Sequence, residues 1–307
     1  MGALDPAARG DAQDLRVDRV GDVVWRTGWG TLEDMQASEP AHTETVLGVR
    51  FFMGDVHAAV DRMLRGGLLV VPAAPALKDL QTQPAYRQAL LEADLVIADS
   101  AFMVLVWNHL VARRCGGRKL LRLSGLEYLR ELLQRPQVRS EGSTFWIMAG
   151  ERSAARNLAW LAEQGIVVPD THVYNAPMYG AMDGTDLEDP VLLERLEQLR
   201  PQHVVVTIGG GTQERLGLYL RRRLSFVPGI HCIGAAIAFL SGDQAAIPVW
   251  ADKMYLGWLL RTIESPSRYG PRYWAARKLL QLMVRYGPNL PPAIPNGADR
   301  TGKKLPV

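Results

Sequence analysis

Short apolar runs alternate along the chain with stretches in which apolar positions recur every three or four residues. The runs begin with VLGVRFF near Val46 and continue with GLLVVPA, LVIAD, KLLRLS, TFWIMAG, THVYNA, HVVVTIGGG and GIHCIGA. Their length is typical of buried strands, and the stretches between them are long enough to form helices. The pattern predicts repeated βαβ units.

The intervening helices are predicted after Asp55, which caps the first of them, and over residues 84–93, 100–114, 125–133, 153–164, 190–199 and 213–223. An alternating chain of this kind indicates an α/β fold with a doubly wound, mostly parallel, Rossmann-like sheet. We expect three parts. Residues 1–43 form an irregular arm, 44–245 form the core, and 246–307 form a helical basic and aromatic C-terminal appendage, with a loose tail from Pro288.

Composition narrows the classes of protein that fit. The 307 residues carry a net charge of +3, which does not indicate nucleic-acid binding. Cys115 and Cys232 lack CxxC spacing, and the histidines lack metal-ligand spacing, so we expect no disulfide framework and no metal. No apolar run approaches the roughly 20 residues needed to span a bilayer, and no signal peptide is recognised. A cytoplasmic protein is expected.

The segment after about residue 244 is both aromatic and basic, and only Asp252 and Glu264 oppose its positive charges. A solvated basic helix pair, a nucleic-acid surface and a segment lying in a membrane interface all fit such a pattern. Tryptophan and tyrosine rings among spread basic residues favour the interfacial segment. An anionic lipid surface attracts each nearby Lys or Arg by about 1 kcal/mol, which gives reversible docking.

Two charged residues follow predicted strands, at the edge where open α/β sheets bind ligands. Asp99 ends LVIAD, where its carboxylate can serve as a general base or simply cap the next helix. Arg122 lies near the end of KLLRLS, where its guanidinium can hold phosphate or form a structural ion pair. The local pattern leaves both alternatives open.

Two glycine turns also follow strands. Gly209, Gly210 and Gly211 precede Thr212, Gln213 and Glu214, and their backbone amides can approach a diphosphate at a helix N-terminus. A tight turn with Thr212 as the helix cap explains the same residues equally well. Gly150, ahead of Ser153, is a second turn of this kind, with the same two explanations.

Taken together, these blocks resemble the WecG/TagA/CpsF glycosyltransferases (glycosyltransferase family 26), which make bacterial surface polysaccharides from nucleotide sugars and lipid-linked acceptors. The resemblance runs from about Val46 to Tyr273. Its main blocks are VLGVRFF, YRQALLEADLVIADSAFMVLVW, RLSG, FWIMAGERSAARN, GGGTQERLG, GAAIAFLSG and WADKMYLGWLLRTIESPSRYGPRY.

The resemblance implies roles for particular residues. Asp99 stands at the family's proposed catalytic base, and Arg122 matches the arginine before its RxxG turn. The nucleotide-sugar site then comprises Gly150, Gly210, Gly211, Gln213 and Glu214. The arginines that are thought to meet the acceptor's diphosphate at the membrane match Arg261, Arg268 and Arg272.

Three departures bear on the donor. Ala73 stands where the family often has Asn, Ala238 where it commonly has Asp, and Ala246-Ile247-Pro248 where it has Arg-Ala-Pro. The pattern resembles an exopolysaccharide subgroup whose donors include glucose, glucuronate or another hexose, and the choice among them stays open.

The expected activity is inverting transfer of a hexose from a UDP-sugar to a polyprenyl-diphosphate-linked saccharide at the inner face of the cell membrane. The chain has no DxD motif, so we expect neither metal nor cofactor, with arginines and helix N-termini stabilising the leaving diphosphate. Family members are often homo-oligomers. A dinucleotide enzyme is disfavoured because no GxGxxG follows the first strand. A non-catalytic adaptor that binds lipid or a partner in polysaccharide assembly is the alternative, which the departures at Ala73 and Ala238 leave open.

Overall fold

A computed structural model describes residues 43–179, 187–243 and 277–294. Its centre is a six-stranded, entirely parallel sheet in the order β4-β3-β8-β7-β5-β6, which confirms the predicted Rossmann-like fold. The strands are β3 (Gly67–Val70), β4 (Leu95–Val96), β5 (Thr144–Met148), β6 (Val173–Asn175), β7 (His203–Val206) and β8 (Gly229–Cys232).

The central strands are buried on both faces, which explains their continuous apolar sequences. Alternate residues enter two separate cores. Leu68 and Val70 of β3 join one core, whereas Leu69 joins the other. Each core is a layer of buried side chains between the sheet and the helices on one of its faces.

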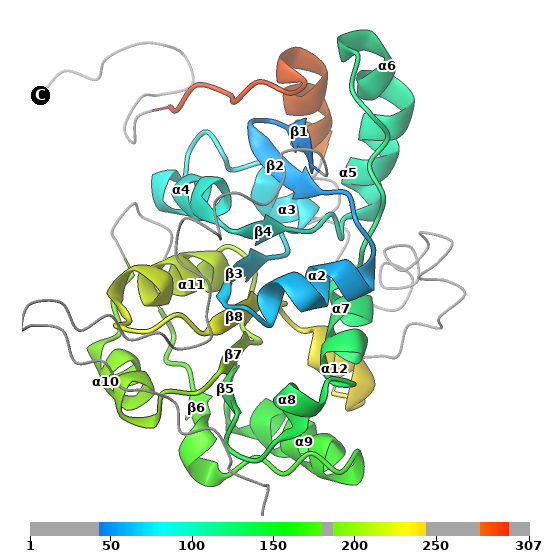
Figure 1. Ribbon diagram of the computed structural model, residues 1–307. Coiled ribbons are helices and arrows are strands. Elements are labelled where there is room, and N and C mark those ends of the chain that lie inside the picture. The colour runs from blue at the N-terminus through cyan, green and yellow to red at the C-terminus, as the bar shows by residue number, and fades with distance from the viewer. Residues whose placement is uncertain (1–42, 180–186, 244–276, 295–307) are drawn as a thin grey trace, which may run out of the picture. The chain divides into compact units, whose positions relative to one another are not determined.

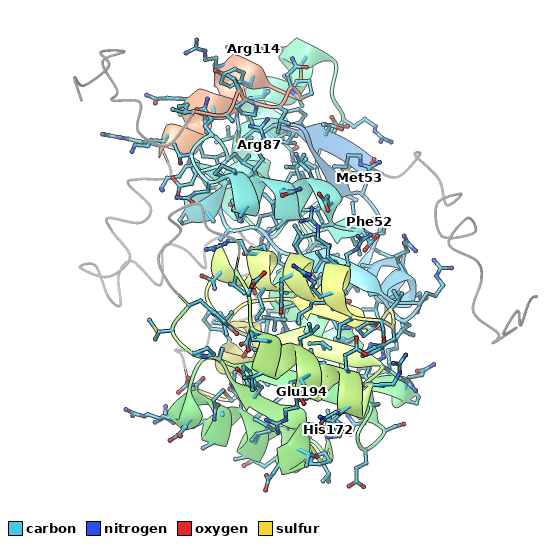
Figure 2. The ribbon with its side chains drawn as sticks, turned by 90° about the vertical axis from the view of Figure 1, so that its left-hand side faces the viewer. Phe52, Met53, Arg87, Arg114, His172 and Glu194 are labelled. Atoms are coloured by element: carbon cyan, nitrogen blue, oxygen red, sulfur yellow. The ribbon has the colours of Figure 1, made fainter. Side chains whose placement is uncertain are left out.

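Helices cover both faces of the sheet (Figure 1). The face of Leu68 is covered by α3 (Ala74–Leu77), α4 (Pro84–Glu92), α10 (Pro190–Leu199) and α11 (Thr212–Arg223). Figure 2 looks onto this side, with Arg87 on α4 and Glu194 on α10 labelled. The opposite face is covered by α2 (Val56–Met63), α7 (Gly125–Leu132), α8 (Pro136–Arg139), α9 (Glu151–Glu163) and α12 (Ala236–Leu240). A 3₁₀ turn, η3 (Asp170–His172), precedes β6.

The predicted first strand is instead a hairpin, so that expectation was wrong. β1 (Thr43–Val46) and β2 (Val49–Phe52) pair antiparallel outside the main sheet. Leu47 and Gly48 between them have φ of 53° and 79°, as a two-residue hairpin turn requires. Their amides donate to the carbonyls of Gly287 and Pro288. Contacts from the far end of the chain thus stabilise a turn that leucine disfavours locally.

KLLRLS does not form the predicted strand either. Its backbone is bonded by side chains of the preceding helix, which consists of α5 (Ala101–Val106), the π-helical turn η2 (Trp107–Val111) and α6 (Ala112–Cys115). Trp107 Nε1 donates to the carbonyl of Arg118, the residue before this segment, and the Asn108 amide bonds both the N–H and the C=O of Leu120 within it. With these groups already paired to side chains, the segment adds no ladder at the sheet edge.

Residues 277–286 are helical and bury Leu279 and Met283 in the core. Residues 288–294, expected to be a loose tail, are bonded to the hairpin and to the α3–α4 connection, where Ile294 N donates to Gln81 O at 2.7 Å. Within the described part of the chain, no helix is long and apolar enough to cross a membrane.

Candidate active site

The strand order places a topological switch point, and with it a candidate ligand crevice, between β5 and β7. The chain leaves β5 toward β6 through α9 on one face, and it leaves β7 in the opposite direction toward β8 through α11 on the other face. Such a switch point at the carboxyl ends of strands is where open α/β sheets bind ligands. Both predicted glycine turns, at Gly150 and at 209–211, flank this crevice.

Asp99 and Arg122 meet at the same edge, beyond β4. Arg122 Nε donates to the backbone oxygen of Asp99 at 2.8 Å, and its Nη2 lies 3.5 Å from Asp99 Oδ1. The amide of Gly125, the first residue of α7, donates to the same Oδ1 at 3.3 Å. The Asp99 side chain stays 39% exposed, whereas that of Arg122 is 14% exposed. The arginine therefore supports a carboxylate that solvent and substrate can reach.

Asp99 is not the cap of α5, although the sequence allowed that function. Ser100 is the N-cap, and its hydroxyl accepts from Met103 N at 3.2 Å. The carboxylate of Asp99 instead turns toward α7. The alternative of a plain helix cap is wrong because the next residue already satisfies the helix terminus.

The turn after β7 is open on its outer side. Among the described residues, a side-chain carbon added at Gly209 or Gly210 would meet no atom within 4 Å. Gly211, with φ of 92°, is the N-cap of α11, so Thr212 lies inside the helix and does not cap it. The amide of Gly211 is already bonded to Glu214 Oε2 at 2.6 Å. Gly209 and Gly210 are therefore the residues at which a ligand can approach the backbone closely.

Gln213 and Glu214, predicted to contact the nucleotide sugar, lie beneath this turn with 2% and no exposure. Gln213 Nε2 donates to Glu214 Oε1 at 3.3 Å, and its Oε1 accepts from Gly234 N, after β8, at 2.6 Å. Burial raises the pKa of Glu214 to about 7. Sequence reasoning could not find the bond to Gly234, because 21 residues separate its ends.

The region around Asp99 and the glycine turn after β7 lie along one continuous edge of the sheet. A side-chain carbon added at Gly125 would lie 3.4 Å from Val71 after β3 and 3.5 Å from the Ile233 carbonyl after β8, so α7 begins directly over these strand ends. Three strand spacings separate β4 from β7, about 14 Å. An extended nucleotide sugar is long enough to cover that length from the glycine turn to Asp99.

The second glycine turn, at Gly150, is also open, since no atom in the part of the chain that the structure describes lies within 4 Å of an added side-chain carbon. Gly150 is the N-cap of α9 and has no side chain to bond the helix amides. Behind it lies a polar cluster that sequence reasoning missed. Asp243 accepts from Ser153 at 2.9 Å and from Arg156 at 3.0 Å, and buried Asn157 accepts from Ser241 at 2.6 Å. The polar i, i+4 pair Ser153 and Asn157 was its one sequence signal.

Other predicted features are placed as follows. Arg261, Arg268 and Arg272 lie outside the described residues. No group of three His, Cys, Asp or Glu within the described ranges is arranged to hold a metal. A cavity of about 340 Å³ is lined by α4, α11, Leu187 and Glu188, and none of the predicted site residues lines it.

The fold defines a Rossmann-like α/β protein, with a topological switch point and a supported, partly exposed carboxylate at the carboxyl edge of its sheet. The particular family follows from comparison with known proteins. The family model described as "Glycosyl transferase WecG/TagA/CpsF family" matches residues 44–290, and the chain belongs to that family. No curated protein matches the chain. Because it belongs to this family, the protein is a glycosyltransferase whose substrates are a sugar donor and a saccharide acceptor.

Proposed function

We propose that this glycosyltransferase is a metal-independent, inverting hexosyltransferase of bacterial surface or exopolysaccharide synthesis, which uses a UDP-sugar and a polyprenyl-diphosphate-linked saccharide. One observation carries the proposal. Asp99, which the sequence placed at the family's base, lies at the carboxyl edge with Oδ1 held by Gly125 and Arg122 and with 39% of its side chain exposed. A general base needs such a fixed, accessible carboxylate.

In the proposed reaction the acceptor hydroxyl gives its proton to Asp99 as its oxygen attacks the anomeric carbon of the donor. The bond between that carbon and the diphosphate oxygen breaks on the opposite side, and the bonding electrons leave with UDP. Configuration inverts, and no covalent enzyme intermediate forms. Arg122 positions Asp99 through the bonds to its backbone oxygen and its carboxylate.

The donor's diphosphate lies against the turn at Gly209 and Gly210 in this proposal. These positions have open space outside them, and the turn leads into the N-terminus of α11, whose dipole favours negative charge. Gly150 and the N-terminus of α9 form the other wall of the crevice. The departing UDP is thereby stabilised by backbone dipoles and arginine charge without a metal.

The acceptor half of the proposal places the enzyme on the anionic inner face of the cell membrane. Its support is the sequence of residues 246–276, in which Arg261, Arg268 and Arg272 lie among tryptophans and tyrosines. These arginines are proposed to hold the acceptor's diphosphate, and a homo-oligomer is the proposed assembly. The Asp99 chemistry does not depend on either point.

The deciding experiment is a donor screen. Release of UDP, or of another nucleoside diphosphate, is measured from a panel of nucleotide sugars, with a polyprenyl-diphosphate-linked saccharide in liposomes that contain anionic lipid. EDTA is included in a parallel set. The proposal expects one UDP-hexose to support transfer, with an unchanged rate in EDTA. Liposome binding without turnover of any donor refutes the enzyme proposal and identifies a non-catalytic adaptor, and activity abolished by EDTA refutes metal independence.

A further inference from the structure

The turn between β7 and α11 is held by hydrogen bonds whose directions are fixed. Gly211 N–H donates to Glu214 Oε2 at 2.6 Å, and Gly234 N–H donates to Gln213 Oε1 at 2.6 Å. Because a backbone N–H only donates, the oxygen of the Gln213 amide must face Gly234, and its NH₂ group must face Glu214 Oε1. Glu214 therefore receives one donor on each oxygen.

An ionised carboxylate accepts on both oxygens without placing a hydrogen of its own in either contact. A protonated Glu214 presents a hydroxyl hydrogen on one oxygen, and a glutamine presents NH₂ at the same position. If that donor faces Gln213, the Gln213 amide must turn over to offer its oxygen, and its NH₂ then faces the N–H of Gly234. Two buried donors cannot satisfy each other. A donor placed between positions 214 and 213 thus breaks the link to the loop after β8.

Glu214 changes its charge close to neutral pH. Burial raises its pKa to about 7, opposed in part by the N–H groups of Glu214 and Gly211 and by Gln213. The ionisable groups facing it from neighbouring elements are Tyr86 on α4 and the Cys232 thiol on β8. Burial, together with the nearby Glu214 charge, raises the pKa of both, so they remain neutral while Glu214 titrates.

A buried carboxylate is costly for the fold, so its presence beneath an open turn calls for a reason. We infer that Glu214 is a positioning residue that, only when ionised, locks the loops after β7 and β8 into the donor-binding arrangement, acting through Gly211 and Gln213 without touching the donor. The inference rests on the proposed function for the identity of the ligand. The hydrogen-bond directions hold whatever the ligand is.

Reversing the two side chains tests the directions. Glu214→Gln or Gln213→Glu alone leaves mismatched groups. In the variant that combines both, the new amide at position 214 accepts from Gly211 through its oxygen and donates through its NH₂ to the new carboxylate at position 213. The other oxygen of that carboxylate accepts from Gly234. Every donor again has an acceptor, with the same net charge. The single variants are therefore expected to bind the donor more weakly than the wild type. The double variant is expected to recover the affinity.

UDP-glucose serves as the probe, because its diphosphate does not change charge between pH 5.5 and 8.5. We expect wild-type affinity, measured by calorimetry, to fall about tenfold from pH 8.5 to 5.5, equivalent to about 1.4 kcal/mol, with a midpoint near pH 7. Glu214→Gln should bind at every pH as weakly as the wild type does at pH 5.5. The double variant should come within about threefold of the wild type at pH 8.5.

Stability separates positioning from mere structural support. The folded-state pKa of Glu214 lies above its unfolded value, so ionisation removes stability as pH rises through 7. Removal of the buried charge in Glu214→Gln offsets the mismatched donors, so its urea midpoint at pH 8.5 should equal or exceed that of the wild type, although it binds more weakly. A lower midpoint with unchanged pH dependence of binding overturns the inference, as does a double variant no better than the singles.

Hydrogen exchange tests this hydrogen-bond arrangement without a ligand. Peptides covering residues 207–216 and 233–236 should lose protection, corrected for intrinsic exchange, in Glu214→Gln and regain it in the double variant. If protection is lost and regained in this way while the wild type binds no UDP-glucose at any pH, the hydrogen-bond arrangement is supported and the proposed donor is wrong. Equal protection in all variants overturns the hydrogen-bond arrangement itself.

Discussion

Replacing Asp99 with asparagine separates the two tasks of its carboxylate. Oδ1 accepts bonds from Gly125 N and Arg122 Nη2, at 3.3 and 3.5 Å. An asparagine can place its own oxygen there and keep both bonds. Its amide nitrogen then replaces the other oxygen and cannot take a proton from an acceptor hydroxyl. The variant retains the support of the loop and removes the proposed base.

The expected magnitudes differ widely between stability and rate. Hydrogen bonds to a charged group contribute about 1.5–3 kcal/mol and neutral ones about 0.5–1.5, so Asp99→Asn should cost about 1 kcal/mol of unfolding free energy. Both bonds are long, which favours the lower end. Loss of a general base lowers kcat by about 10² to 10⁴, equivalent to about 3–5 kcal/mol in the barrier.

The assay is UDP release with the donor found by the screen and the lipid-linked acceptor, alongside urea unfolding. Ser100→Ala is the matched control in the same loop. It removes the cap of α5, which costs about 1 kcal/mol of stability, and leaves Asp99 in place. We expect Ser100→Ala to retain kcat within about threefold and Asp99→Asn to lose at least about a hundredfold. Near-normal turnover by Asp99→Asn would refute the assignment of the base.

Three further perturbations have definite expected outcomes. Burial lowers the pKa of His203 to about 4, so its contribution to stability is present above pH 6.5 and is lost, by about 3 kcal/mol, as pH falls toward 4. The raised pKa of Glu214 changes stability with pH in the opposite direction, so the His203 contribution is isolated by comparing His203→Gln with the wild type. Between pH 7.5 and 4 the variant should lose less unfolding free energy than the wild type. Equal losses would contradict the contribution of His203. Gly210→Ala meets open space, so it should change stability by less than about 0.5 kcal/mol yet weaken UDP-glucose binding about tenfold in calorimetry; unchanged binding would place the donor elsewhere. Gly217→Ala should do the reverse, costing about 1–3 kcal/mol in urea unfolding because its new carbon would lie 2.6 Å from Cys232 Sγ; a stability gain would show that α11 packs less closely.

Much of the fold could be predicted from local sequence. The buried strands at LVIAD, TFWIMAG and HVVVT have helix-period stretches beside them, and Asp55 caps its helix, accepting from Ala58 N at 2.8 Å, as its position suggested. These features depend on neighbours within a few residues. The same local signals located the glycine turns and Asp99, because ligands of a parallel sheet meet the residues that follow its strands.

The two wrong strand predictions, at VLGVRFF and KLLRLS, have a common cause in hydrogen bonds to residues outside each segment. The turn at Leu47 and Gly48 is bonded to Gly287 and Pro288, and Leu120 in KLLRLS is bonded to the side chain of Asn108. Periodicity measures only how apolar a segment is. It does not report whether a backbone finds its partner in a strand, a side chain or a distant loop.

The sequence by itself thus determined the class of sheet and most of its strands and helices, and it indicated the loops after the strands as the candidate site. Only the tertiary structure decided that β5 and β7 are neighbours at the switch point, that Ser100 caps α5 and leaves the Asp99 carboxylate to α7, and that Glu214 lies beneath the glycine turn. Strand order and hydrogen-bond direction arise when segments far apart in the chain meet, and no local pattern encodes that meeting.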